Sequence, residues 1–251
     1  MAKILEIEGL SKSYDGKKYA LFDCSFTLQS GKICAIVGES GSGKSTLLRL
    51  IAGLERPNAG TISIKGQIVS DDNRIVPPQE RNVGLVFQDF ALFPHLTVEQ
   101  NIAFGLKEKT KETVAYWLQL IKMEQYQKVY PATLSGGQEQ RVALVRTLAL
   151  NPELLLLDEP FSNLDTTLKA ELRQEIRQLI NRIGTSMIFI THDLLDALDI
   201  ADEIILLKDG RILQHSSMSD FAKNIQHPAT LKLISDLKAN AERILAVLQN
   251  K

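Results

Sequence analysis

The chain has 251 residues, of which 44% are hydrophobic and 24% charged, and its formal net charge is −1. These values are ordinary for a globular protein of one large or two small domains, and they argue against a strongly basic nucleic-acid-wrapping protein. No apolar run approaches the roughly 20 residues of a membrane-spanning helix. The start, "MAKILEIEGL", lacks the long apolar region of a signal peptide. We therefore expect any role at a membrane to depend on a partner.

Short β segments open the chain. The stretch 4–10 alternates in polarity, and 61–69 has the pattern of a hairpin that turns at Lys65-Gly66. Four continuous apolar runs have the length of strands: 33–38, 83–88, 154–158 and 187–191. Strands buried on both faces have this composition, which predicts a parallel sheet covered by helices.

Helices are expected between these strands. One is predicted at 44–54 and another at 168–183, where apolar residues recur on one face: Leu168, Leu172, Ile176, Leu179 and Ile183. From about 97 to 150 the β signals vanish and the apolar spacing stays helical, which indicates a helical insertion. A further hairpin is predicted at 203–214, turning at Asp209-Gly210. The stretch 229–248 is expected to be a helix that packs on its own domain or forms a short dimer seam.

Cys24 and Cys34 are the only cysteines in the chain. Both lie in apolar surroundings, and their separation does not match the spacing of metal ligands. We expect them to be reduced core thiols of a cytosolic protein, with a disulfide as the alternative.

The segment "GESGSGKST" (38–46) fits the pattern G-x-x-x-x-G-K-[ST] at Gly38, Gly43, Lys44 and Ser45. It follows a predicted strand and opens a predicted helix, which is the context of a Walker A phosphate-binding loop (P-loop). Glycines let consecutive N–H groups point at an anion, the lysine adds a charge on the phosphates, and the serine hydroxyl can ligate Mg²⁺. The expected nucleotide-binding residues here are Gly38, Ser40, Gly41, Ser42, Gly43, Lys44, Ser45 and Thr46.

Polar groups end the other three buried strands. In "LLLLDEP", Asp158 is placed to hold Mg²⁺, and Glu159 to polarise an attacking water. His192 in "FITHD" and Gln88 in "VFQD" are placed to contact the γ-phosphate, the metal or the water. Any one of these polar residues could simply end a strand. Four buried strands that each end in a polar group at the same sheet edge indicate a functional site. The candidate catalytic residues are Glu159, His192, Gln88 and Lys44, and the candidate metal ligands are Ser45, Gln88 and Asp158.

The segment "LSGGQEQR" (134–141) places two glycines in the first turn of a predicted helix. Ser135 and Gln138 have the spacing of a capping box, which is the simpler interpretation. A capping box does not explain Gly136 and Gly137, which favour close approach of a ligand to the backbone. Because a helix N-terminus attracts negative charge, the expected ligand is an anion.

Together, these motifs resemble the ATP-binding cassette of ABC transporters over roughly 4–220. The resemblance implies a P-loop α/β core with a mainly parallel sheet, an N-terminal antiparallel β subdomain and an inserted helical subdomain. It implies one ABC ATPase domain over 1–251, divided into a core at 1–96 and 151–220, a helical signature subdomain at 97–150 and a C-terminal helical tail at 221–251.

The resemblance also implies roles for further residues and a set of cofactors. ATP and Mg²⁺ would be bound, and Tyr14 would stack on the adenine. The signature would contact an ATP held by a second subunit in a head-to-tail homodimer, through Ser135, Gly136, Gly137 and Gln138. Asp165 of "SNLD" would line that dimer interface.

The stretch 87–106 is similar to cassettes of bacterial importers for iron(III), polyamines, sulfate and related anions. Such a cassette sits at the cytoplasmic face of the inner membrane, docks on transmembrane permease subunits and serves a periplasmic or lipid-anchored binding protein, with no nucleic acid involved. Phe90, Leu92 and Phe93 are candidates for permease contact, and core packing is the alternative for each.

Alternative functions remain. Many importers of this type carry a further β-rich domain of about a hundred residues, which the end at Lys251 does not leave room for, so an importer of polar amino acids stays open. A soluble ABC ATPase without a transport role is another alternative. A GTPase or nucleotide kinase is disfavoured because the guanine-recognition pattern Asn-Lys-x-Asp is missing and "LSGGQ" would be unexplained.

Overall fold

The computed structural model describes residues 2–106, 108–162, 166–221, 231 and 235, without the side chains of 166–168. Asp165 and the side chain of Leu168 lie outside the described residues, as does nearly all of the stretch 229–248.

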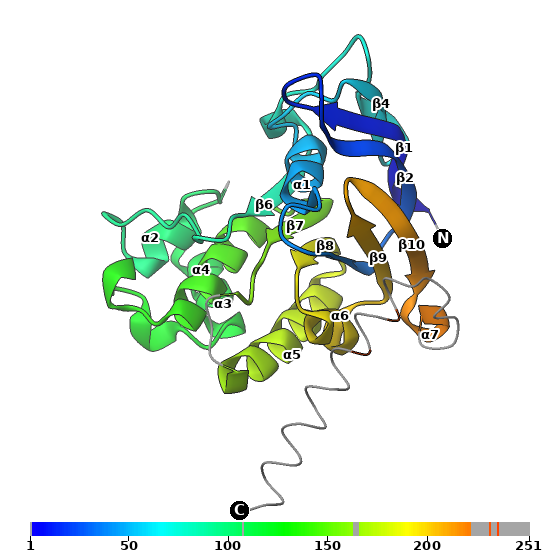
Figure 1. Ribbon diagram of the computed structural model, residues 1–251. Helices are drawn as coiled ribbons and strands as arrows, with labels where there is room; N and C mark the ends of the chain where they lie inside the picture. Colours follow the sequence, from blue (N-terminus) through cyan, green and yellow to red (C-terminus); the bar gives the residue numbers. More distant parts are fainter. Residues whose placement is uncertain (1, 107, 163–165, 222–230, 232–234, 236–251) are drawn as a thin grey trace, which may run out of the picture.

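The described chain contains two sheets, and most of its helices pack on one face of the larger sheet (Figure 1). The strands are β1 (Lys3–Ser13), β2 (Tyr19–Gln29), β3 (Ile33–Val37), β4 (Ala59–Ile64), β5 (Gln67–Ser70), β6 (Val83–Val86), β7 (Leu154–Asp158), β8 (Ser186–Thr191), β9 (Glu203–Lys208) and β10 (Arg211–Ser217). The α-helices are α1 (Lys44–Ala52), α2 (Val98–Ala103), α3 (Lys111–Leu120), α4 (Gly136–Leu148), α5 (Thr166–Ile183), α6 (Leu194–Ile200) and α7 (Met218–Phe221). Short 3₁₀ helices lie at Pro78–Glu80, Glu124–Tyr126 and Pro131–Thr133.

The larger sheet has the strand order β10-β9-β3-β8-β7-β6. Its strands pair in parallel from β9 to β6, and only the edge strand β10 is antiparallel. The smaller sheet, β2-β1-β4-β5, is antiparallel throughout. The predicted fold, a mainly parallel sheet with an antiparallel β subdomain, is therefore confirmed.

Two predicted hairpin turns are also confirmed. Lys65 and Gly66 have φ of 50° and 74°, and Asp209 and Gly210 have φ of 48° and 74°. Positive φ at both central residues is the geometry that joins antiparallel strands through two residues, and a glycine at the second position adopts it without strain.

Strand β2 does not follow from the sequence pattern. Its apolar alternation breaks between Leu21 and Cys24, where Asp23 adopts a positive φ of 50° and the register with β1 shifts. The irregularity interrupts the period of two, so the segment lacks the pattern of a regular strand.

Alternate residues of the buried strands enter two separate cores. In β3, Ile33, Ala35 and Val37 pack on the side of α2 to α6, whereas Cys34 and Ile36 pack on the side of α1 and the antiparallel sheet. Between 97 and 150 the described residues form only helices, which lie together at the left of Figure 1. The larger sheet is thus covered on both faces, which explains why its strands are continuous apolar runs.

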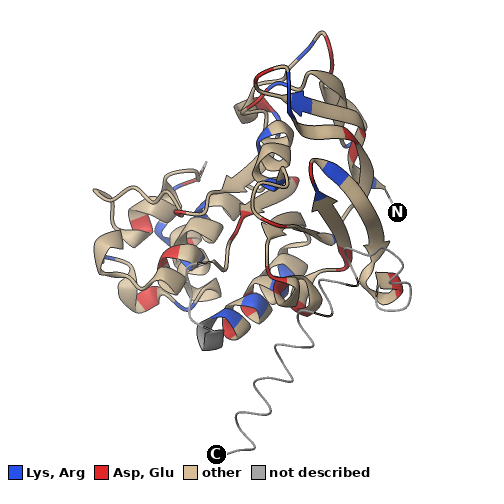
Figure 2. Ribbon diagram, in the orientation of Figure 1, with Lys and Arg blue, Asp and Glu red and all other residues tan. Residues whose placement is uncertain are grey.

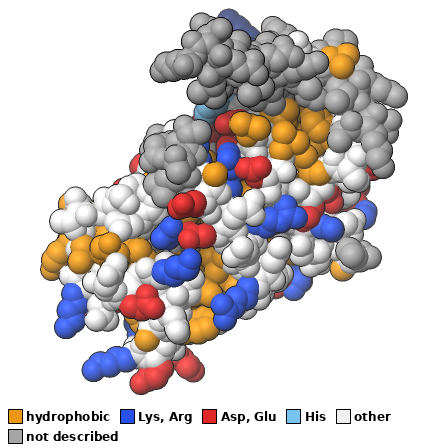
Figure 3. All heavy atoms as spheres, turned by 90° about the horizontal axis from the view of Figure 1, so that it is seen from below, with side chains coloured by type: hydrophobic (Ala, Val, Ile, Leu, Met, Phe, Trp, Pro, Cys, Tyr) orange, Lys and Arg blue, Asp and Glu red, His pale blue; other side chains and the backbone are white. Residues whose placement is uncertain are grey.

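Both cysteines are buried free thiols, as expected, and burial raises the pKa of each. Within the described residues, every helix falls short of the length and apolar character that crossing a bilayer requires. Acidic and basic side chains are interspersed over the ribbon and on the face seen from below (Figures 2 and 3).

A buried arginine joins the antiparallel sheet to the end of α1. Arg81 is only 2% exposed, and burial lowers its pKa to about 10. Its guanidinium donates to four backbone carbonyls, those of Val76 (2.7 Å), Leu50 (2.9 Å), Ile51 (2.9 Å) and Val69 (3.1 Å). The carbonyls of Leu50 and Ile51 end α1, and the Leu50 carbonyl also accepts from the N–H of Gly53 at 3.1 Å. Arg81 thus adds a donor to each of the last carbonyls of the helix.

Replacing this side chain is expected to destabilise the fold. Arg81→Met should lower the free energy of unfolding by about 3 kcal/mol or more, since it removes charge-assisted hydrogen bonds and leaves buried acceptors unpaired. Urea unfolding measures the effect. Arg56→Met is a matched control, because Arg56 is exposed and donates to a single carbonyl, that of Asp72. It should cost less than about 1 kcal/mol. Equal costs for the two variants would contradict the role of Arg81.

Candidate active site

The phosphate loop lies between β3 and α1, pressed against neighbouring backbone. Gly43, the N-cap of α1, has φ of 106°, and a Cβ there would lie 2.3 Å from the carbonyl oxygen of Ala20. A Cβ on Gly38 would lie 2.2 Å from the carbonyl oxygen of Leu207. Glycine at these two positions is therefore required by close packing, which holds the loop in one conformation.

Lys44 lies inside the loop. It is 4% exposed, and its Nζ donates to the carbonyls of Gly38 (2.7 Å) and Glu39 (2.9 Å). Burial lowers the pKa of Lys44, and the nearby carboxylates of Glu159 and Asp158 oppose this shift. The amine is thus desolvated and fixed by two neutral acceptors, with charge still available for an anion.

Ser45 and Asp158 meet across the sheet edge. Ser45 Oγ donates to Asp158 Oδ1 at 3.3 Å. Burial raises the pKa of Asp158, while the hydrogen bond from Ser45 lowers it. These are the hard oxygen donors that Mg²⁺ prefers. The described residues contain no group of three or more His, Cys, Asp or Glu able to hold a metal by itself. A site of this kind fits Mg²⁺, which is usually held by one or two carboxylates together with substrate phosphates.

Glu159 follows Asp158 directly and contacts the next strand. Its Oε2 lies 3.2 Å from Nδ1 of His192, and its N–H donates to the carbonyl of Ile190 at 3.2 Å. Glu159 has a φ of 45°, in a region that residues other than glycine seldom adopt. The two predicted catalytic side chains on β7 and β8 are therefore brought within contact distance.

Gln88 is connected to Glu159 through Ser162, a residue that the sequence analysis did not predict. Its Nε2 donates to Ser162 Oγ at 3.3 Å, and Ser162 Oγ donates to the carbonyl of Glu159 at 3.0 Å. Ser162 stands only three residues after Glu159, so its nearness in the chain was the available signal. The sheet order places Gln88, Glu159 and His192 at the carboxyl ends of β6, β7 and β8.

Tyr14 stands beside the first turn of α1. Its ring is 62% exposed, and its hydroxyl donates to Glu55 Oε2 at 2.6 Å and lies 3.2 Å from Thr46 Oγ1. Burial and the hydrogen bond to Glu55 raise the pKa of Tyr14. Glu55, which the sequence did not single out, thus fixes an exposed aromatic ring next to the phosphate loop.

The signature segment forms the predicted capping box. Ser135 Oγ accepts from the N–H of Gln138 at 3.4 Å, and Gln138 Oε1 accepts from the N–H of Ser135 at 2.9 Å. Helix α4 begins at Gly136. Within the described residues, no hydrogen bond joins Ser135 or Gln138 to the phosphate loop, so the structure does not bring these two predicted sites together in one chain.

The candidate permease contacts differ in exposure. Phe90 is 7% exposed and belongs to the core on the α2 side, so core packing is the correct interpretation for it. Leu92 and Phe93 are half-buried, and Phe93 packs on Phe104 with ring centroids 4.4 Å apart. These two stay predictions.

A buried hydrogen-bond network fixes the backbone on both sides of His192. Thr191 Oγ1 donates to Asp196 Oδ2 at 2.6 Å, and Arg173 of α5 donates to Asp196 Oδ1 at 2.7 Å. Thr191 also accepts from the N–H of Asp193 at 3.0 Å. Asp196 is 2% exposed. The residues on both sides of His192 are therefore fixed to Asp196 and, through it, to α5.

Asp196→Asn is expected to destabilise the protein and displace His192. Removing the charge leaves Arg173 without its buried carboxylate, which should lower the free energy of unfolding by about 3 kcal/mol. Urea unfolding measures this loss, and a crystal structure of the variant detects the displacement of His192. Asp199→Asn is the control, because Asp199 also pairs with Arg173 (2.8 Å) but its side chain is 39% exposed. It should cost under about 1 kcal/mol; a cost like that of Asp196→Asn would exclude the positioning role.

Residues 21–162 match the family model described as ABC transporter. The chain belongs to the ABC transporter family. The match includes both the phosphate loop and the signature, which supports the resemblance predicted from the motifs.

Individual ABC proteins resemble the chain over most of its length. It is 44% identical over 234 residues to "Sulfate/thiosulfate import ATP-binding protein CysA" of Bacillus cereus, which covers 89% of this chain and 64% of that protein. It is 43% identical over 236 residues to "Putrescine transport ATP-binding protein PotG" of Escherichia coli, covering 92% of this chain and 60% of that protein. The chain thus spans less than two thirds of the length of these two relatives.

A solved ABC cassette has the same fold. The dimeric structure of the ATP-binding cassette MJ0796 in a post-hydrolysis state, bound to ADP and Pi, aligns with a TM-score of 0.73 and 30% identity. The alignment covers 85% of this chain and 98% of that one. This likeness confirms the predicted fold class.

Proposed function

We propose that the chain is the ATP-binding and ATP-hydrolysing subunit of an ABC importer. The observation that carries the proposal is the convergence at one sheet edge of Lys44 inside the phosphate loop, the Ser45–Asp158 pair and the Glu159–His192 pair. The membership in the ABC family and the names of the relatives, both ATP-binding proteins, support it.

Each residue has a part in this function. The loop 38–46 binds the phosphates of ATP through its N–H groups, and Lys44 contributes a desolvated charge. Ser45, Asp158 and Gln88 would hold Mg²⁺, which supplies charge neutralisation on the phosphates when bound. Glu159 accepts a proton from the attacking water, and His192 orients the Glu159 carboxylate and the γ-phosphate. Tyr14 offers its exposed face to the adenine.

The protein acts as a head-to-tail homodimer in this proposal. The signature residues Ser135, Gly136, Gly137 and Gln138 lie at the N-terminus of α4, where unpaired N–H groups favour an anion. Since no hydrogen bond in the described residues connects Ser135 or Gln138 to the phosphate loop of the same chain, the ATP they contact would be held by the partner copy. Asp165 would lie in the same interface. The dimeric state of the MJ0796 cassette supports this arrangement.

The proposed function assigns a role to each part of the chain. Residues 1–96 and 151–220 form the nucleotide-binding core, 97–150 the signature subdomain and 221–251 a tail. The cassette docks from the cytoplasmic side on transmembrane permease subunits, which receive substrate from a binding protein. Sulfate or a polyamine is the cargo class that the relatives favour.

Affinity purification from native membranes tests the transport role. The tagged chain, solubilised gently, should bring down a multi-span protein in stoichiometric amount, identified by mass spectrometry. The binding protein of the same system can then be titrated with sulfate and with putrescine to decide the cargo. Recovery of non-membrane partners alone would overturn the transport role and favour a cassette ATPase that works in solution.

A further inference from the structure

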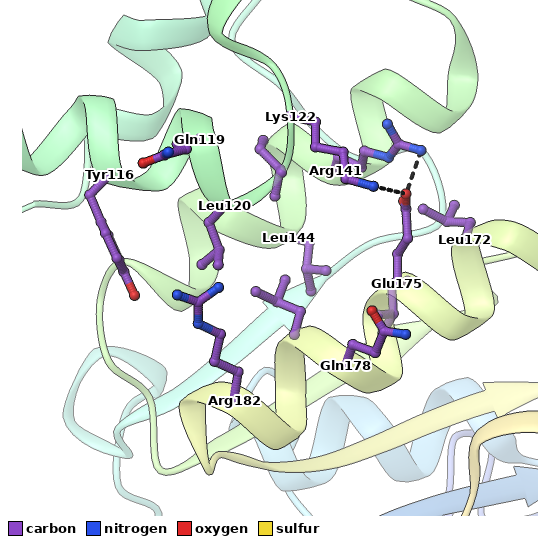
Figure 4. A pocket seen from close by; sticks show the side chains of 13 residues that line it. Tyr116, Gln119, Leu120, Lys122, Arg141, Leu144, Leu172, Glu175, Gln178 and Arg182 are labelled. Atoms are coloured by element: carbon purple, nitrogen blue, oxygen red, sulfur yellow. Dashed lines mark ion pairs between the residues drawn. The ribbon is translucent and has the colours of Figure 1, made fainter.

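A cavity of about 440 Å³ lies between α3, α4 and α5 (Figure 4). Small-molecule pockets usually measure about 300–1,000 Å³, so the cavity is large enough for an organic ligand. None of the described residues that we assign to ATP or Mg²⁺ lines it. It is therefore a separate site from the one described above.

The floor of the cavity is apolar. Leu144 of α4 and Leu172, Ile176 and Leu179 of α5 line it, and each is less than 9% exposed. Leu120 at the end of α3 adds a further apolar wall. An occupant with an apolar body would gain from leaving water here.

The polar groups of the rim carry an excess of positive charge. Its charged lining residues are three cations, Lys122, Arg141 and Arg182, and one carboxylate, Glu175. Glu175 already pairs with Arg141 at 2.8 Å and with Lys122 at 3.5 Å. The charge of Glu175 is thus neutralised by Lys122 and Arg141, which lie on the same side of the cavity.

On the opposite side of the cavity, Arg182 is available to bind a ligand. Figure 4 shows it reaching from α5 toward Leu120 of α3, away from the Glu175 cluster. No ion pair involves Arg182 within the part of the chain that the structure describes. Among the described residues, the cavity therefore combines an apolar floor with one guanidinium, that of Arg182, that no protein carboxylate pairs.

We propose that this cavity binds an amphipathic organic carboxylate, with its apolar body on the floor and its carboxylate on Arg182. A guanidinium binds a carboxylate through paired hydrogen bonds. A cation is disfavoured by the excess positive charge, and a simple inorganic anion would leave the apolar floor unused.

The ligand would act on the proposed ATPase, and this part of the proposal rests on the proposed function. Helix α4 begins at the signature, and α5 carries Arg173, which holds the network behind His192. An occupant in contact with both helices restrains them relative to each other. The carboxylate would therefore change the rate of ATP turnover without touching the nucleotide.

The binding step is tested with decanoate as the probe. Trp117, the single tryptophan, follows the cavity-lining Tyr116 and packs edge-on against its ring at 5.5 Å, so its fluorescence reports occupancy. Decanoate should change this emission saturably with one site per chain, and decyltrimethylammonium should bind more weakly. A lack of saturable binding below the micelle concentration, or equal affinity for the two, would overturn the proposal.

Two variants of one exposed residue locate the site. Arg182→Ala should weaken decanoate about tenfold, the effect of losing one charge-assisted hydrogen bond. Arg182→Glu should reverse the preference toward decyltrimethylammonium. Lys169→Ala is the control, because Lys169 lies on α5 but does not line the cavity. Loss of affinity in the control, or unchanged affinity in both Arg182 variants, would place the carboxylate elsewhere.

The regulatory step has its own readout. Decanoate at a concentration near its dissociation constant should change ATP turnover of the unmodified protein and change that of Arg182→Ala much less, because a tenfold weaker site is then mostly empty. Unchanged turnover of an active protein with proven decanoate binding would overturn the regulatory role. Because fluorescence measures binding without ATP, failure of the ATPase proposal would be recognised separately.

Discussion

Glu159→Gln is expected to reduce ATP turnover by about 10³-fold while leaving ATP binding intact. The substitution keeps the size and hydrogen-bonding reach of the side chain, but the amide cannot accept the proton of the attacking water, and a general base contributes roughly 10²–10⁴-fold. A steady-state phosphate-release assay measures turnover, and equilibrium titration with ATP measures binding.

The same variant should accumulate as an ATP-bound dimer, because hydrolysis would no longer release the interface. Sizing at saturating ATP and Mg²⁺ detects it. Glu153→Gln is the matched control, since Glu153 immediately precedes β7, at the opposite end of that strand from Glu159, and pairs with Lys65 at 2.7 Å. Ordinary turnover in Glu159→Gln would remove this residue from the mechanism, and a monomer at saturating ATP would contradict the head-to-tail homodimer.

Lys44→Ala is expected to lose most of the affinity for ATP. The amine is buried, held by the carbonyls of Gly38 and Glu39, and placed to contact the phosphates. Hydrogen bonds to charged groups contribute about 1.5–3 kcal/mol, so the dissociation constant should rise at least tenfold. Calorimetric titration of ATP into each protein provides the measurement.

Lys32→Ala supplies the control for this experiment. Lys32 directly precedes β3, at the strand end away from the phosphate loop, so its removal should leave ATP affinity unchanged. Urea unfolding of both variants separates a loss of affinity from a loss of folded protein. Unaltered affinity in a folded Lys44→Ala would mean that the phosphates bind elsewhere.

The strands of the larger sheet were predictable because burial on both faces leaves a continuous apolar run in the sequence. β3, β7 and β8 all have this pattern. β2 was not predictable, because its bulge at Asp23 breaks the alternation that identifies a strand with one buried face. Local patterns thus identify regular elements and miss irregular ones.

The candidate site shows the same limit at the level of side chains. Lys44, Asp158 and Glu159 follow from motifs whose spacing is fixed by chemistry. Ser162 stands near Glu159 in the chain, but its contact with the distant Gln88 was not predicted. Glu55 escaped prediction because it acts through a hydrogen bond to Tyr14, which is distant in the chain. Such contacts depend on the tertiary arrangement of the chain, for which a short motif holds no information.

The backbone of Glu159 has a consequence for how the sequence can change over evolutionary time. A φ of 45° costs a glutamate side chain of the order of 1 kcal/mol or more, and glycine would adopt it without strain. In the proposed function this strain is kept for the sake of the carboxylate. A descendant with glycine at this position would therefore be expected to bind nucleotide and no longer hydrolyse it.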